Sequence, residues 1–157
     1  MLKSLLGAIF RRTPIPLRRL YARVFNARFS VTAGAIVIDD TGRLLLLKHV
    51  FRAGSGWGIP GGFIQAGEQP EEALRRELRE EVGLELESAE IAFIRTLKRI
   101  KQIEILFFCR PHGKAEPNSV EVEEIGWFSP DSLPRTLPED QRLLIERALS
   151  YRGKRRN

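Results

Sequence analysis

Three glutamates, Glu77, Glu80 and Glu81, lie within five consecutive positions of the chain. On a helix with about 100° per residue and Glu77 at zero, Glu81 lies near +40° and Glu80 near −60°. The three carboxylates therefore project from one side, where like charges destabilise an isolated helix. Carboxylate oxygens are also the ligands that Mg²⁺ and Mn²⁺ prefer. The pattern fits either a salt-bridged surface helix or a site for a divalent cation.

The residues around these acids predict the helix that positions them. Pro70 stands at a favourable first helical position, and Gly83 ends the helix after about Val82. Leu74, Leu78 and Val82 form an apolar stripe beside the carboxylates on the same wheel. We expect this stripe to face a core while the acids line a neighbouring groove.

The acids are part of a longer pattern that begins at a glycine and ends at a leucine, from Gly62 to Leu84. It reads G-x5-E-x7-R-E-U-x-E-E-x-G-U, where U is aliphatic, and every specified position matches. These positions are Gly62, Glu68, Arg76, Glu77, Leu78, Glu80, Glu81, Gly83 and Leu84. This is the Nudix box, and the chain resembles a Nudix (MutT-like) hydrolase over residues 31–150.

The resemblance implies roles for residues of the box and for the residue before it. Glu80 and Glu81 match the metal ligands of the family, and Glu77 matches a position that binds metal or takes a proton from water. Arg76 matches the residue that orients this glutamate through a salt bridge. Gly61 matches a ligand that acts through its backbone carbonyl, and the implied metal is Mg²⁺ or Mn²⁺.

Residues outside the box are assigned on weaker patterns. Glu121 lies six positions before Trp127, where some family members place a further metal-binding glutamate; Glu123 and Glu124 compete for this role. Alternation along a strand would put Glu121 and Glu123 on one face and Glu124 on the other. Three cations, Arg52, Lys98 and Arg99, could bind a diphosphate. Neither histidine, His49 or His112, is assigned a role.

Hydrophobic patterning outlines the rest of the domain. Residues 31–38 and 44–47 are β-branched or apolar runs that flank a turn at residues 39–42, so they predict a hairpin. Further strands are expected at 91–97, 103–109 and 120–128, a turn or short helix at 130–134, and a closing amphipathic helix at 137–149. This mixture predicts an α/β or α+β class. The resemblance implies an α/β/α sandwich around a mixed sheet.

Charge divides the chain into three parts. Residues 1–30 contain seven Lys or Arg and no acid, and the tail at 151–157 adds four more cations. The segment between them, residues 31–150, is the expected Nudix domain. In the N-terminal extension, Leu2, Leu5, Leu6, Ile9 and Phe10 predict an amphipathic helix, and a second helical piece is expected at residues 17–25. We expect this extension to pack on the domain; pairing of two subunits or binding to a membrane surface are the alternatives.

The expected function is Mg²⁺-dependent hydrolysis of a pyrophosphate bond in a nucleoside diphosphate linked to another group. Such substrates include nucleotide sugars, ADP-ribose-like compounds, CDP-alcohols and nucleoside triphosphates. Two alternatives stay open: an RNA 5′-end pyrophosphohydrolase that holds nucleic acid with its basic ends, and a non-catalytic nucleotide-binding module. The single Cys109 and the absence of a long apolar run fit a cytoplasmic location. The sequence leaves a homodimer open.

Overall fold

The computed structural model describes residues 7 and 10–156. Its helices are α2 (Ile15–Phe25), α3 (Pro70–Val82) and α4 (Glu139–Arg156), with short 3-10 turns η1 (Lys98–Ile100) and η2 (Pro130–Ser132). Its strands are β1 (Ser30–Val37), β2 (Leu44–His49), β3 (Trp57–Gly58), β4 (Gly61–Phe63), β5 (Glu85–Leu97), β6 (Gln102–His112) and β7 (Val122–Phe128).

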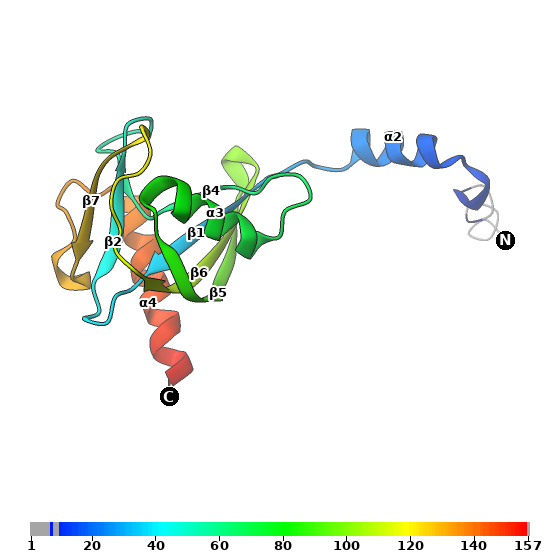
Figure 1. Ribbon diagram of the computed structural model, residues 1–157. Helices are drawn as coiled ribbons and strands as arrows, with labels where there is room; N and C mark the ends of the chain where they lie inside the picture. The colour runs from blue at the N-terminus through cyan, green and yellow to red at the C-terminus, as the bar shows by residue number, and fades with distance from the viewer. Residues whose placement is uncertain (1–6, 8–9, 157) are drawn as a thin grey trace.

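The strands form two sheets. The first has the order β4-β1-β6-β5, with β1 and β6 parallel and the other pairs antiparallel. The second has the order β3-β2-β7 and is antiparallel. The sheets are flanked by α3 and α4, so the mixed α/β/α sandwich expected from the sequence is confirmed (Figure 1).

Alternating side chains on the central strands supply two cores, one for each helix. Ala35 and Val37 of β1 pack with the apolar stripe of α3. Their neighbour Ile36 packs on the other side with Leu144 and Ile145 of α4. Since successive strand residues point to opposite faces, an almost continuous apolar run serves both layers. This packing fixes α3, and with it the acidic residues, against the first sheet.

The predicted hairpin between residues 31–38 and 44–47 is wrong, although both strands exist. The turn forms, with Gly42 N–H donating to the Asp39 carbonyl at 3.0 Å. Beyond a single bridge between Ile38 and Leu44, however, the strands separate into different sheets. Strand β1 pairs on its two edges with β4 and β6, and β2 pairs with β3 and β7. A local turn signal does not determine these long-range partners.

The strands and the helix predicted after residue 90 are present, and β5, β6 and α4 are longer than predicted. Strands β5 and β6 form a long antiparallel pair whose connection is the basic turn η1. Helix α4 starts after the turn at η2 and continues past residue 150, where Tyr151 stacks on Phe93 with ring centroids 5.4 Å apart. The basic tail therefore begins inside a helix.

The N-terminal helix α2 lies apart from the sandwich, at the end of an extended connection (Figure 1). Its existence was predicted, but none of its residues is buried, so it does not pack on the domain. Of the residues in the first predicted helix, Leu2, Leu5, Leu6 and Ile9 lie outside the described part of the chain. None of the described helices is long and apolar enough to cross a membrane.

Candidate active site

Helix α3 is held at both ends by local signals. At its start the Gln69 side chain and Glu72 form a reciprocal capping box, with Gln69 N–H donating to Glu72 Oε2 at 2.9 Å. At its end Gly83 adopts the left-handed conformation, with φ at 64°. Leu74 and Leu78 are fully buried. As expected, the apolar stripe faces the core, and Glu77 and Glu81 lie against strand β4.

Glu81 is the most buried of these acids, with 6% of the residue exposed. Its Oε2 accepts a hydrogen bond from Gly61 N–H at 3.3 Å. Its Oε1 lies 2.9 Å from Nε2 of His49, at an angle that does not suit a hydrogen bond. A buried charge needs compensation from its surroundings, and Arg52 also interacts electrostatically with Glu81.

Glu77 lies against the glycine backbone of β4. A Cβ added to Gly62 would lie 2.3 Å from Cδ of Glu77, so the carboxylate occupies the space that a side chain would take. Burial raises the pKa of Glu77, and repulsion from Glu81 and Glu80 adds to this effect. A hydrogen bond from Arg76 acts in the opposite direction. The net shift favours proton retention by Glu77.

Arg76 links the acids to the loop before the helix. Its guanidinium contacts Glu68 at 2.9 Å, Glu77 at 2.8 Å and Glu80 at 3.3 Å. It also donates to the Phe63 carbonyl at 3.1 Å. The hydrogen bond to Glu68 is the largest effect that raises the pKa of Arg76 still further. These contacts fit the orienting role that the family resemblance implies for Arg76.

The carboxylates are paired with side chains rather than arranged around a common point. Across residues 7 and 10–156, no group of three or more His, Cys, Asp or Glu side chains is placed to hold a metal ion directly. The donor chemistry nevertheless fits a divalent cation. Glu77, Glu80 and Glu81 outnumber the single positive charge of Arg76, and burial together with repulsion from Glu81 and Glu80 raises the pKa of Glu77. Hard oxygen ligands of this kind suit Mg²⁺ or Mn²⁺.

A cavity of about 210 Å³ opens beside these acids. Gly61 and Gly62 line it, and the same two residues contact Glu81 and Glu77. The other lining residues are Thr32, Ala33, Gly34, Arg52, Ile59, Pro60, Phe63, Gln102, Glu104 and Gln141. A molecule bound here would therefore lie beside the acidic end of α3.

Arg52 supplies a cation to this cavity. Its Nη2 donates to the Ile59 carbonyl at 3.1 Å, while Nη1 is buried without a hydrogen-bond partner among the described residues. A Cβ on Gly58 would lie 2.0 Å from Nη1, so the glycine leaves room for the guanidinium. Burial lowers the pKa of Arg52, although Glu81, Asp140 and Glu104 oppose this effect. An anion in the cavity would give Nη1 a partner.

The structure does not bring Lys98, Arg99 or Glu121 to this cavity. Lys98 and Arg99 lie in the exposed turn η1 and are not among the residues that line it. Glu121 is exposed and precedes β7; its carbonyl accepts a hydrogen bond from Val50 N–H at 2.9 Å. The metal and substrate roles of these three residues remain predictions.

A β-bulge disturbs the alternation expected among the late acids. The register shifts between Lys48 and His49, so that Lys48 pairs with Glu124 and His49 with Val122. Glu123 and Glu124 are consequently both exposed. Glu123 forms an ion pair with Lys48 at 2.9 Å. A bulge adds a residue to one strand, and a simple two-residue period does not reveal it.

Sequence reasoning missed several residues of the site. His49 was assigned no role, yet it contacts Glu81. Gln102 lines the cavity and donates to Thr32 Oγ1 at 2.8 Å, and Gln141 accepts from Ile59 N–H at 3.2 Å. Each contact joins segments far apart in the chain. No local pattern signals them.

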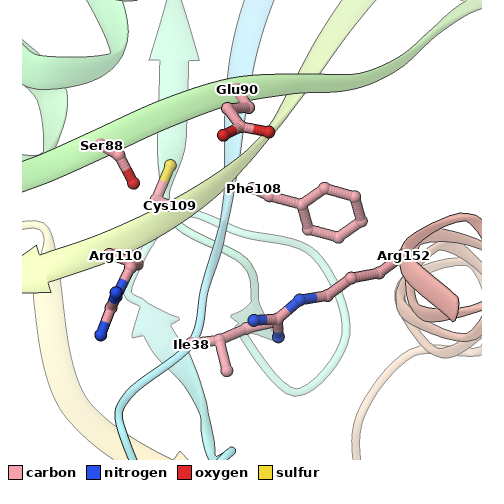
Figure 2. Close-up of a pocket in the computed structure, with 7 residues that line it drawn as sticks. All are labelled: Ile38, Ser88, Glu90, Phe108, Cys109, Arg110 and Arg152. Carbon is pink, nitrogen blue, oxygen red and sulfur yellow. The ribbon is translucent and has the colours of Figure 1, made fainter. Parts of the chain in front are cut away.

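A second cavity, of about 280 Å³, lies between β5, β6 and α4, and no predicted site residue lines it (Figure 2). Figure 2 shows the guanidinium groups of Arg110 and Arg152 reaching toward it from different elements. Arg110 already forms an ion pair with Asp40 at 3.0 Å. Burial raises the pKa of Cys109 to about 12, so this thiol is not a reactive nucleophile.

Comparison with known proteins agrees with this geometry. The chain is 30% identical to a MutT-like protein of Streptomyces ambofaciens over 125 residues, covering 79% of each chain. It is also 30% identical to the 8-oxo-dGDP phosphatase NUDT18 of Homo sapiens, covering 78% of this chain but 40% of that protein. The crystal structure of a MutT NUDIX hydrolase from Burkholderia pseudomallei is similar, with 29% identity and a TM-score of 0.68. That similarity covers 77% of this chain and 98% of the Burkholderia chain.

The family model of the NUDIX domain matches residues 28–148. This range contains every element of the sandwich up to most of α4, together with Arg76, Glu77, Glu80 and Glu81. The N-terminal helix α2 lies outside it. The chain belongs to the Nudix family.

Proposed function

We propose that this protein is a divalent-metal-dependent pyrophosphohydrolase that cleaves a diphosphate bond in a nucleotide derivative. The observation that carries the proposal is the contact between the acidic end of α3 and the glycine backbone of β4. Gly61 binds Glu81 through its N–H, and Gly62 leaves the space that Glu77 fills. Both glycines also line the cavity that holds the Arg52 guanidinium. The carboxylates of α3, the glycine backbone of β4 and the Arg52 guanidinium therefore lie around one cavity.

In this proposal Glu77, Glu80, Glu81 and the Gly61 carbonyl hold Mg²⁺ or Mn²⁺. When bound, such a cation neutralises phosphate oxygens and lowers the pKa of a coordinated water. Because Arg76 and His49 contact the acids in the described structure, binding requires these side chains to give up part of those contacts. Glu68 would keep Arg76 in place while its contacts to Glu77 and Glu80 change.

The reaction proposed is attack of water on phosphorus. A new bond forms between the water oxygen and phosphorus, and the bond from phosphorus to the bridging oxygen breaks. Glu77 takes a proton from the water as general base. Arg52 binds the diphosphate and balances its charge through Nη1, which has no hydrogen-bond partner in the described part of the chain. The two products are phosphate-containing fragments of the substrate.

The family comparisons support a nucleotide derivative as the substrate class. The human relative is named an 8-oxo-dGDP phosphatase, and a relative from an Enterobacter strain is named a nucleoside triphosphatase. A related structure from Shewanella oneidensis contains ADP ribose, although its 20% identity supports the fold alone. These different molecules share a nucleoside attached to a diphosphate. The cavity, with its polar Gln102, Gln141 and Thr32, is where we place this group.

The experiment is product release from a panel of nucleotide compounds with Mg²⁺ and, separately, Mn²⁺. The panel holds ADP-ribose, CDP-alcohols, nucleotide sugars, nucleoside triphosphates, dinucleoside polyphosphates and triphosphorylated RNA. Glu81→Gln is compared with Glu71→Gln, a matched change on the same helix at a residue paired with Arg75. We expect turnover of at least one compound, loss in Glu81→Gln and retention in Glu71→Gln. Binding without cleavage of any compound would instead favour the nucleotide-binding module.

A further inference from the structure

The N-terminal segment carries an apolar surface that the domain does not cover. Leu17, Leu20, Tyr21, Val24 and Phe25 of α2 are all strongly exposed, with Phe25 at 70%. At about 100° per residue they fall on one side of the helix. A single exposed apolar residue needs no explanation, but a continuous exposed stripe marks an interaction surface.

The opposite side of α2 is cationic. Arg19 and Arg23 lie there, Arg18 lies at the boundary beside Leu17 and Tyr21, and residues 10–30 contain no acid. The described cations of this segment are Arg11, Arg12, Arg18, Arg19, Arg23 and Arg28. A helix with arginines on one face and aromatic and aliphatic side chains on the other is typical of peptides that lie in a membrane interface.

A second patch of the same kind lies where α2 joins the domain. Ser30 N–H donates to the Lys101 carbonyl at 3.0 Å, which places the start of β1 beside the turn η1. Thr32 pairs with Phe63, so the end of β4 lies at the same edge of the sheet. This edge carries the exposed apolar residues Phe29, Phe63 and Ile100 and the cations Arg28, Lys98, Arg99 and Lys101.

We propose that α2 and this adjoining edge dock the protein on an anionic lipid bilayer. The apolar side of α2 would enter the interface between headgroups and acyl chains, and the arginines would contact anionic headgroups. Charge favours this partner over a second copy of the segment, because two segments that carry only cations repel each other. RNA would satisfy the cations but would leave Leu20, Val24 and Phe25 exposed to water.

The docking surface gives Lys98 and Arg99, which do not line the cavity, a role in binding lipid headgroups. The edge that carries them includes Phe63 and lies next to Thr32 and Gln102, and these three residues line the cavity beside the acids. A bilayer bound at this edge would lie near the opening of the cavity. The inference about binding does not depend on the proposed hydrolysis.

The test is sedimentation of the full chain with vesicles of phosphatidylcholine, with and without phosphatidylserine. Val24→Glu places a charge on the apolar side of α2, and Leu143→Glu makes the same change at an exposed position of α4. We expect binding to the phosphatidylserine vesicles, weaker binding at high salt and a loss of roughly tenfold or more in Val24→Glu. Leu143→Glu is expected to bind like the wild type, and circular dichroism of both variants to match it.

Four results would overturn the proposal. The wild type could stay in the supernatant with both vesicle types, or Val24→Glu and Leu143→Glu could bind equally well. Light scattering could also show a dimer that Val24→Glu dissociates, with no vesicle binding, which would assign the apolar side to a second copy. Salt-sensitive binding of single-stranded RNA in place of vesicles would assign the cations to nucleic acid. Hydrolysis by Val24→Glu without vesicles is expected to equal that of the wild type.

Discussion

Helices α2 and α3 have similar sequences in one respect: both combine an apolar stripe with several arginines. Their surroundings differ. The stripe of α3 is buried against the first sheet, and Arg75, Arg76 and Arg79 each contact a glutamate. No residue of α2 is buried, and no acid accompanies its arginines. Amphipathic periodicity therefore predicts a helix without showing what covers it, whereas the acids of α3 predict a site.

The largest expected difference between the two helices concerns stability. Leu78→Ala removes a fully buried side chain from the core beneath α3, so the free energy of unfolding should fall by about 2–5 kcal/mol. Leu20→Ala on α2 removes an exposed side chain and should change it by no more than about 0.5 kcal/mol. Chemical denaturation of both variants measures this contrast. Equal losses would show that α2 packs on the domain in solution.

The next effect tests the backbone opposite α3. Gly62→Ala would place a Cβ 2.3 Å from Cδ of Glu77 and displace its carboxylate. Since a displacement of about 1 Å in a catalytic group can cost about 100-fold, kcat should fall by roughly this factor. Gly153→Ala, where a Cβ meets nothing within 4 Å, is the control. An unchanged kcat in Gly62→Ala would show that catalysis does not depend on the contact between Glu77 and Gly62.

A smaller effect separates the predicted substrate-binding cations. Arg52→Gln removes the guanidinium from the cavity and should raise KM roughly tenfold, the loss expected for a charged hydrogen bond of about 1.4 kcal/mol. Arg99→Gln, in the exposed turn η1, should leave KM for a soluble substrate nearly unchanged. Steady-state kinetics of both variants measures the two KM values and shows which cation binds the substrate. The reverse order would place the diphosphate near η1 and outside the cavity.

The smallest effect concerns the ion pair that anchors the loop before α3. A hydrogen bond from Arg76 lowers the pKa of Glu68 from 4.5. A carboxylate with a lowered folded-state pKa contributes stability above its unfolded pKa and loses it as pH falls through the folded value. Glu68→Gln should therefore unfold at a slightly lower denaturant concentration at pH 7, and the difference should disappear in acid. Arg19→Gln on α2 should show no difference at either pH.

The sequence predicted those parts of the fold that local signals control. Pro70, Gly83 and the stripe through Leu74 and Leu78 were sufficient to place α3 and orient its acids. The pairing of β1 and β2 could not be predicted in the same way. Their turn forms locally, but each strand pairs with segments from other parts of the chain. A strand buried on both faces carries no signal that selects its neighbour.

The same limit applies to the site. The box identified the residues that share one helix, because their spacing alone places them together. His49, Gln102 and Gln141 come from β2, β6 and α4, and only the folded chain brings them near the acids or the cavity. The bulge at Lys48 likewise removed the strand alternation expected among Glu121, Glu123 and Glu124.

The central claim is that the acids at the end of α3 hold a divalent cation. Titration with Mn²⁺, followed by electron paramagnetic resonance of the free ion, tests it without a substrate. The account predicts that the wild type and Glu71→Gln bind Mn²⁺ with similar affinity and that Glu81→Gln binds roughly tenfold or more weakly. Equal affinity in all three proteins, or no binding by the wild type, would contradict it.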